Sequence, residues 1–147
     1  MKDIGTWAFY KCNNLAKITF PDGLETIGAG CFSESGLKEV VIPSNVTVIG
    51  KNAFKESKNL KKISFQGGSK LEKIGSDCFS GTGIEEFLAP SSLREIGSNA
   101  FYNCKNLERI TLNEGLEKLE GYMDYVLSSF GDPSDRDDWY KQYTGVF

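Results

Sequence analysis

The hexapeptide Ile-Gly-x-x-(Ala/Cys)-Phe occurs five times in this chain, and its recurrence constrains the fold more than any other feature. Successive copies start 23, 22, 25 and 22 residues apart, at Ile4, Ile27, Ile49, Ile74 and Ile96. A period in the twenties is typical of stacked structural units, each of which is too small to bury its own apolar face. The sequence therefore predicts a solenoid whose units are stabilised mainly by their neighbours.

A second pattern, Leu-x-x-Ile-x-Phe or a close variant, follows each hexapeptide. Its last three residues alternate apolar, polar and apolar in most copies, which is typical of a strand with one buried face. A turn comes next, usually with Pro or Gly as in Pro21-Asp22-Gly23, and an apolar residue such as Leu24 leads into the following hexapeptide. Each coil thus directs about seven apolar side chains inward.

The phenylalanine that ends each hexapeptide is expected to contribute one ring to every layer, at Phe9, Phe32, Phe54, Phe79 and Phe101. An aromatic platform for bases or sugars is the alternative interpretation of these rings. An identical Phe in every layer is, however, what a continuous core requires. We therefore predict a buried spine of five rings.

The spacing from this Phe to the next Leu or Ile alternates between six and five residues along the chain. The residue before that Leu or Ile alternates in step between Asn and Gly, at Asn14, Gly36, Asn59, Gly83 and Asn106. Because Asn and Gly best tolerate a left-handed backbone, we expect both forms to close the same tight corner.

One strand position alternates between basic and acidic residues, at Lys17, Glu39, Lys62, Glu86 and Arg109. Stacked coils would bring these opposite charges side by side across the sheet. Exposed pairs of this kind contribute about 0–1 kcal/mol each, so they affect register and solubility more than stability. The simpler interpretation is a charge ladder that satisfies itself, and the alternative is a charged strip for a partner.

The four cysteines fall into two columns of the repeat. Cys31 and Cys78 occupy the small-residue slot before the Phe, and Cys12 and Cys104 lie three residues after it. With layers ~4.8 Å apart, each same-column pair is separated by roughly 10 Å or more, beyond the limit of about 7 Å between the Cα atoms of a disulfide. The sequence predicts free thiols, and only a bridge between Cys12 and Cys31 stays open.

Composition argues against several classes of function. The chain contains no histidine, so Ser-His, Cys-His and His-metal arrangements are impossible within it. The net charge of −3 comes without a basic block, which argues against nucleic-acid binding. No apolar run approaches the ~18 residues of a membrane span. We therefore expect no enzymatic activity, no cofactor and no membrane insertion.

The combined pattern Leu-x-x-Ile-x-Phe-Pro-x-x-Leu-x-x-Ile-Gly-x-x-Ala-Phe-x-x-Cys resembles the BspA-like leucine-rich repeats. Residues 15–35 and 107–121 carry it, and the resemblance covers roughly residues 3–120. It implies a right-handed solenoid with a parallel β-sheet on one face and short helical or irregular segments on the other. It also implies a microbial cell-surface or secreted protein that adheres to or otherwise binds proteins, without a catalytic motif.

We assign residues 1–120 to five repeats of 22–25 residues and residues 121–147 to a C-terminal cap. Leu119-Glu120-Gly121 is a degenerate Ile-Gly-x, after which the pattern stops. Helical spacing of the next apolar residues predicts a capping helix, made from Tyr122, Met123, Val126, Leu127 and Phe130. The alternative for this tail is an aromatic docking segment. The nearby acidic residues lack calcium-loop spacing, so we predict no metal site.

At the other end, Met1–Gly5 leads directly into the first repeat, so the sequence predicts no signal peptide there. Ile4, Trp7 and Phe9 would have no earlier layer to pack against, and an uncovered edge of this kind invites pairing. Either further repeats precede this chain in the natural protein, or two chains meet here as a homo-oligomer.

The leading functional hypothesis is an adhesion or interaction module that binds a surface protein of a host or neighbouring cell. The alternative is an intracellular scaffold or self-assembling repeat protein, which would be cytoplasmic if the chain is complete as given. The exposed strand columns, outward-facing tyrosines and uncovered first repeat supply the candidate binding residues Val41, Leu88, Lys38, Lys61, Glu85, Tyr10, Tyr102 and Trp7. The insertion at residues 66–70 is interpreted mainly as tolerated length variation.

Overall fold

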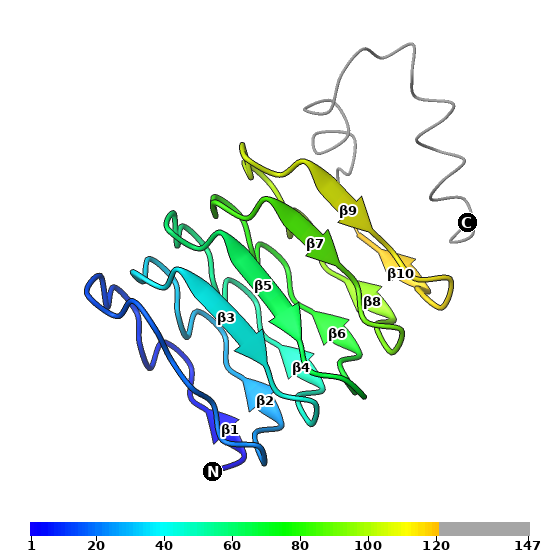
Figure 1. The fold of residues 1–147 in the computed structure, drawn as a ribbon, viewed down its shortest axis with the longest axis horizontal. Coiled ribbons are helices and arrows are strands. Elements are labelled where there is room, and N and C mark those ends of the chain that lie inside the picture. The colour runs from blue at the N-terminus through cyan, green and yellow to red at the C-terminus, as the bar shows by residue number, and fades with distance from the viewer. Residues whose placement is uncertain (121–147) are drawn as a thin grey trace.

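The structure is a computed structural model that describes residues 1–120 as a stack of coils carrying two parallel sheets (Figure 1). Sheet A contains six two-residue strands in the spatial order β1 (Asp3–Ile4), β2 (Thr26–Ile27), β4 (Val48–Ile49), β6 (Lys73–Ile74), β8 (Glu95–Ile96) and β10 (Lys118–Leu119). Sheet B contains β3 (Glu39–Ile42), β5 (Lys62–Phe65), β7 (Glu86–Leu88) and β9 (Arg109–Thr111). Within each sheet the spatial order follows the chain, so every neighbour lies one coil further along.

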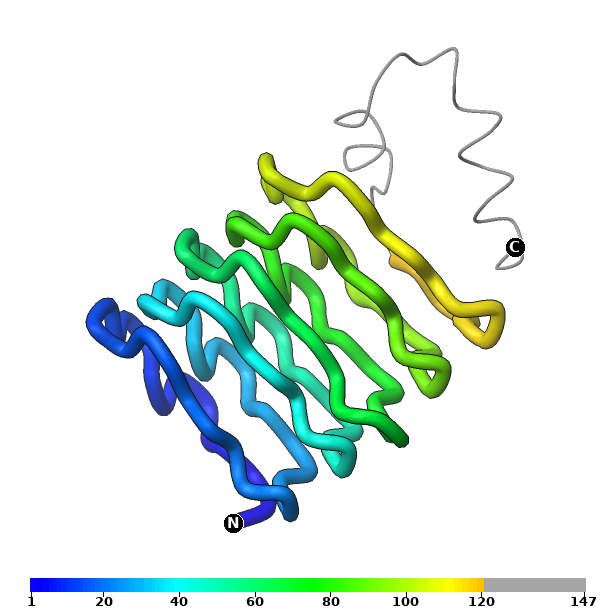
Figure 2. Tube along the Cα trace, in the orientation of Figure 1, coloured from blue at the N-terminus to red at the C-terminus, as the bar shows by residue number. Residues whose placement is uncertain are grey.

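The course of the chain confirms the predicted solenoid (Figure 2). From the second coil on, each coil runs from a strand of sheet A through a long turn to sheet B and returns through a short turn; the first coil has no strand in sheet B. The side opposite sheet B was expected to be helical or irregular, and it consists of turns and the short strands of sheet A, with no helix in residues 1–120. The predicted helical cap at residues 121–147 lies outside the described residues.

In each hexapeptide the Ile ends a strand of sheet A, and the Gly follows that strand. The Ile side chains point into the core and are at most 7% exposed at Ile4, Ile27, Ile49, Ile74 and Ile96. The following Gly lies against the backbone of the preceding coil, since a Cβ on Gly50 would lie 2.7 Å from the backbone N of Ala29. Glycine is therefore required here for close approach between coils, whereas Gly5 in the first coil has no such neighbour within 4 Å.

The predicted spine of five phenylalanine rings is present, with four rings buried and Phe9 in the first coil only partly buried. Neighbouring rings stack nearly parallel, with centroids 5.2, 5.4, 5.6 and 5.7 Å apart along the series Phe9, Phe32, Phe54, Phe79 and Phe101. Such spacing corresponds to offset stacking, the favourable arrangement for parallel rings. Phe32, Phe54 and Phe79 are fully buried, so the spine runs through the centre of the core.

The expected left-handed corner before the Leu or Ile is wrong. Positive φ angles instead occur at the fourth residue of each hexapeptide and two residues after its Phe, at Trp7, Gly30, Asn52, Asp77, Asn99, Lys11, Glu34, Glu56, Gly81 and Asn103. Gly83 has no positive φ; a Cβ there would lie 2.6 Å from the carbonyl oxygen of Lys58, and a Cβ on Gly36 would overlap the carbonyl oxygen of Asn13. These glycines permit close packing of coils rather than an unusual φ.

A column of hydroxyls and thiols lies three residues after each Phe and is buried from the second coil on; the sequence patterns revealed only its two cysteines. The Oγ atoms of Ser35 and Ser57 are 3.1 Å apart, and the Ser57 hydroxyl donates to the carbonyl of Phe32 at 2.7 Å. In the later coils Thr82 Oγ1 donates to the carbonyl of Phe79 at 2.8 Å. The column thus satisfies backbone carbonyls inside the turns, where an unpaired polar group would be destabilising.

Candidate functional site

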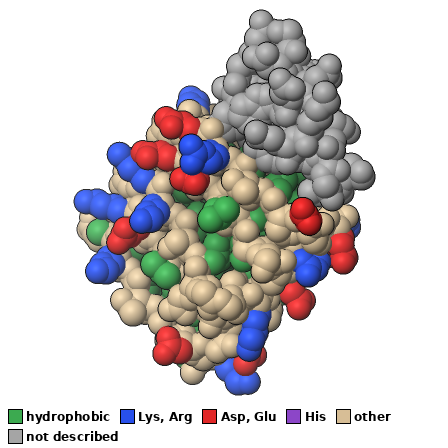
Figure 3. Space-filling model, turned by 45° about the vertical axis from the view of Figure 1, so that its right-hand side comes forward, with side chains coloured by type: hydrophobic (Ala, Val, Ile, Leu, Met, Phe, Trp, Pro, Cys, Tyr) green, Lys and Arg blue, Asp and Glu red, His purple; other side chains and the backbone are tan. Residues whose placement is uncertain are grey.

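The outer face of sheet B carries the two apolar side chains that the strand pattern places outside the core. Val41 on β3 is 51% exposed and Leu88 on β7 is 60% exposed. They occupy the same column of the sheet: Val41 pairs with Ser64 on β5, and the pairing of Lys62 with Glu86 puts Ser64 level with Leu88 on β7. In Figure 3 hydrophobic side chains reach the surface near the middle of the face shown, with charged groups toward its margins.

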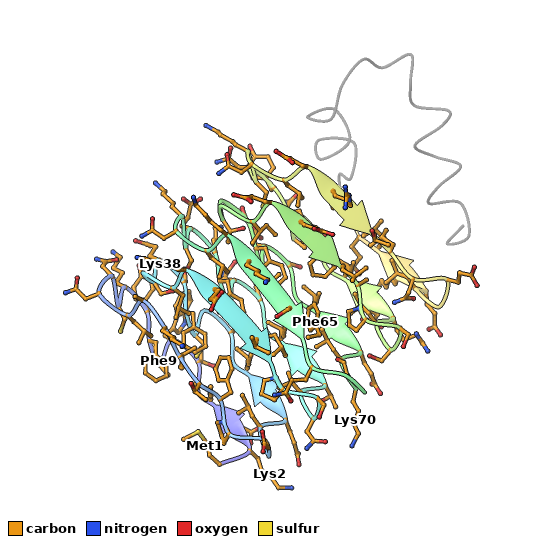
Figure 4. All side chains as sticks on the ribbon, viewed as in Figure 1. Met1, Lys2, Phe9, Lys38, Phe65 and Lys70 are labelled. Carbon is orange, nitrogen blue, oxygen red and sulfur yellow. The ribbon has the colours of Figure 1, made fainter. Side chains whose placement is uncertain are left out.

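The predicted charged residues Lys38, Lys61 and Glu85 form a second exposed column on this face. Each precedes a strand of sheet B, and backbone hydrogen bonds stack them, from Lys61 N to Lys38 O at 3.0 Å and from Glu85 N to Lys61 O at 3.2 Å. Figure 4 shows Lys38 beside the start of β3, with Phe65 at the far end of β5. The structure therefore brings these three residues to the same sheet face as Val41 and Leu88.

The alternating charges are adjacent in register, but they do not close into a continuous ladder. Glu39 pairs with Lys62, Lys62 with Glu86, and Glu86 with Arg109 along the sheet. Among residues 1–120 only one of these neighbours makes an ion pair, between Arg109 Nη1 and Glu86 Oε1 at 3.7 Å. Both partners are largely exposed, so this contact contributes at most about 1 kcal/mol. Most of the charge on this face therefore remains available to a partner.

Trp7, Tyr10 and Tyr102 lie in the long turns that connect sheet A to sheet B, away from the strand face. Trp7 is 48% exposed, has a φ of 59° and packs its ring against Gly30, where a Cβ would overlap it. Its ring meets that of Tyr10 edge-on at 5.1 Å, and the Tyr10 hydroxyl donates to Glu34 Oε1 at 3.1 Å. The structure thus separates the candidate residues into a sheet-B group and a turn group.

The cysteines are all free, as predicted, including Cys12 and Cys31, the pair for which a bridge was left open. Burial raises the pKa of the Cys31 thiol to about 12, and burial also raises the pKa values of Cys78 and Cys104. A thiol that stays protonated is a poor nucleophile and a poor metal ligand. These side chains therefore act as small core residues.

The described residues contain no candidate metal site. Within residues 1–120 there is no group of three or more His, Cys, Asp or Glu side chains arranged to hold a metal ion. The same part of the chain includes no helix of sufficient length and apolarity to cross a bilayer.

The stacked coils, with short parallel strands and inward Leu, Ile and Phe side chains, define a leucine-rich repeat solenoid. The chain belongs to the BspA-type leucine-rich repeat family. Its sequence matches the profile described as "BspA type Leucine rich repeat region" in six copies, over residues 1–108 and 72–125. The matched residues extend beyond the last full hexapeptide, which begins at Ile96. In agreement, Leu119 on β10 pairs with Ile96 on β8, one coil earlier.

Several solved structures of bacterial leucine-rich repeat proteins are similar. The pneumococcal vaccine antigen PcpA is 33% identical, with a TM-score of 0.74 over 80% of this chain and 29% of that chain. A leucine rich cell surface protein from Faecalibacterium prausnitzii A2-165 is 26% identical, with a TM-score of 0.56 over 75% of this chain and 36% of its own. The T. pallidum leucine-rich repeat protein TpLRR shares the fold, at 24% identity and a TM-score of 0.81 over 96% and 76% of the two chains.

The chain therefore spans only about a third of the pneumococcal and Faecalibacterium structures. A comparison with curated proteins gave no match.

Proposed function

We propose that this chain is a protein-binding module of a microbial cell-surface or secreted adhesion protein and that it uses the outer face of sheet B. The observation that carries the proposal is the exposure of Val41 and Leu88 in one column of a sheet whose flanking charges are mostly unpaired. Two similar proteins, a pneumococcal vaccine antigen and a leucine rich cell surface protein, support the location. No catalytic activity is proposed, because leucine-rich repeats generally serve as binding scaffolds.

The size of this face limits how it can bind. Four strands at ~4.8 Å and three residues at ~3.3 Å give an area of roughly 190 Å². A stable protein interface buries about 800 Å² on each partner. A specific partner must therefore also contact the turns, or the natural protein must present further coils beside these.

Replacing Val41 and Leu88 together with Asp is expected to reduce binding of a surface-protein partner at least tenfold. Two carboxylates would stand where the partner buries apolar surface, while the fold should change little because both side chains are exposed. Binding would be measured by biolayer interferometry against a panel of purified extracellular proteins.

The matched control is the Val41→Thr, Leu88→Thr variant. Threonine also favours β-strands, and it adds no charge to the face. If a panel protein binds the wild type and the Asp double variant equally well, the sheet-B face is not the binding surface.

Self-assembly through the first coil is a second candidate, favoured by the exposure of its aromatic residues. Trp7 and Tyr10 are 48% and 40% exposed, and Phe9, Leu15 and Ile18 are only partly buried. Light scattering behind a sizing column tests this for the wild type and for Trp7→Glu. Assembly through this edge predicts a dimer that Trp7→Glu converts to monomer; a monomeric wild type rules the candidate out.

A further inference from the structure

Sheet B is interrupted between its second and third strands, β5 and β7, and we call this interruption the opening. β3 and β5 pair through four residues each, and β7 and β9 through three. Between β5 and β7 the register of paired residues consists of Lys62 with Glu86 and extends no further. On the opposite side, β6 and β8 keep the same two-residue pairing as their neighbours. The opening is therefore local to sheet B.

The cause is an insertion in the turn that follows β5. Leu71 comes six residues after Phe65, whereas the corresponding distance is four in the other coils, as from Ile42 to Val46. The extra residues form a turn in which Gly68 has a φ of 74°, and Lys70 N donates to Ser44 O in the preceding coil at 2.9 Å. The lengthened turn is thus anchored on the β3 side, which leaves the β7 side open.

Backbone groups face each other across this opening. In a parallel sheet successive residues direct their N–H and C=O groups to opposite neighbours. Gln66 N donates to Ile42 O on β3, so the groups of Phe65 point toward β7. Ala89 N donates to Thr111 O on β9, so the groups of Leu88 point toward β5. The paired register stops before Phe65 and Leu88, which leaves their groups directed into the opening.

A groove of about 610 Å³ lies over the opening. Its volume is in the range of sites that bind small molecules or peptide side chains. Lys61 and Lys62 form one wall at the end where β5 begins, opposite Glu85 and Glu86 at the start of β7. The other end carries no charged side chain, and it is lined by Phe65, Leu88, Ala89 and Pro90 together with Gln66, Gly68, Ser69 and Ser91. The groove therefore has a charged end and an uncharged end that includes apolar side chains.

The charges around the groove differ in how far they are already satisfied. Of the charged residues that line the groove, Glu86 is paired with Arg109, whereas Lys61, Lys62 and Glu85 make no ion pair with any residue in 1–120. In the preceding coil the exposed Lys38 and Glu39 are likewise without an ion pair among the described residues and offset each other. Two lysines against one unpaired glutamate leave a surplus of one positive charge on the groove lining.

We propose that this groove binds an extended peptide segment of a partner protein, with an apolar side chain at the Phe65–Leu88 end and an acidic side chain beside Lys61 and Lys62. The main chain of the peptide pairs with the backbone groups of Leu88, as in other modes of peptide binding to sheets. The proposal deepens the proposed function, on which it rests, and assigns the peptide site to one place on the sheet-B face.

Amide hydrogen exchange tests the opening without a ligand. The amides of Phe65 and Leu88 are expected to exchange faster than those of Gln66 and Ala89, which donate to neighbouring strands. Equal protection of all four amides would show that the sheet is closed between β5 and β7, and would overturn the proposal.

The peptide site is tested with a phage-displayed random dodecapeptide library selected on the immobilised protein. Enriched peptides are expected to share an apolar residue and an acidic residue, and synthetic copies would be titrated by fluorescence polarisation. Leu88→Asp should weaken their binding at least tenfold. Val41→Asp and Thr111→Asp, equivalent changes in the same column on β3 and β9, should change it less than threefold.

Deletion of Gly67 and Gly68 is the second variant, because it restores the four-residue spacing of the other coils and should close the groove. Loss of peptide binding in this variant and in Leu88→Asp supports the groove. If Val41→Asp weakens binding as much as Leu88→Asp while the deletion has no effect, the groove is wrong but sheet-B binding stands. If no variant changes binding, or if the library yields no binder, the groove is not a peptide site, and the proposal that the module binds protein through the sheet-B face is contradicted as well.

Discussion

Replacing Phe54 with Ala is expected to lower the free energy of unfolding by about 3–5 kcal/mol. Phe54 is fully buried and stacks between Phe32 at 5.4 Å and Phe79 at 5.6 Å. Its removal creates a cavity in the middle of the spine and ends ring contact on both sides. Since domains of this size are stable by only about 5–15 kcal/mol, the loss should be visible directly in urea denaturation followed by circular dichroism.

The comparison for this variant is Phe9→Ala, in the first coil. Phe9 is only partly buried and stacks on one ring of the spine, that of Phe32 at 5.2 Å. The Phe9→Ala variant should therefore lose less than half as much free energy of unfolding as Phe54→Ala. Equal losses at the two positions would mean that the stacked spine does not dominate the core.

Replacing Gly50 with Ala is expected to destabilise the fold by about 2–3 kcal/mol, although it adds only one methyl group. The new Cβ would lie 2.7 Å from Ala29 N and 2.9 Å from Gly28 C, which are backbone atoms of the preceding coil. Backbone in a hydrogen-bonded stack cannot move aside as the end of a flexible side chain can. The two coils must therefore separate, and the midpoint of urea denaturation should fall.

Gly67→Ala provides a matched control within the same coil. A Cβ on Gly67 would have no atom within 4 Å, and Gly67 does not have a positive φ. This variant should be neutral or slightly stabilising, because Ala reduces the conformational freedom of the unfolded chain. If Gly50→Ala and Gly67→Ala unfold at the same urea concentration, close approach between coils does not explain the repeated glycine.

The features that repeat in every coil could be predicted from the sequence. The period of the hexapeptide predicts stacking, and the identical Phe in each copy predicts the spine that the rings of Phe32, Phe54 and Phe79 form. The alternation in the strand pattern predicts that Val41 lies on the outside. Such features depend on the pattern alone, because each coil presents the same environment to the next.

Features that depend on the neighbouring coil could not be predicted. The sequence shows that Gly36 and Gly83 occupy a corner, but only the structure shows that a carbonyl of the preceding coil fills the space of their Cβ atoms. The sequence also did not predict the positive φ angles at Trp7 and Lys11. Turn geometry is imposed by stacking in these coils, and it overrides the local preference of the residue.

The candidate site was predicted only in part, because its exposed residues follow from the strand pattern but its groove does not. The exposure of Val41 and Leu88 follows from strand alternation, whereas the opening beside Leu88 follows from two extra residues in a turn. Such an insertion is usually harmless to stability, which is why the sequence favours an interpretation as length variation. Its effect on the pairing of β5 and β7 becomes visible only when the two coils are seen together.

Protein binding by the outer face of sheet B, and within it by the groove between β5 and β7, is tested most directly by a backbone-amide NMR titration with a peptide selected from the library. Chemical-shift changes are expected to concentrate in residues 61–66 and 85–91. Changes confined to sheet A or to the turns around Trp7 and Tyr102 would contradict binding by this face.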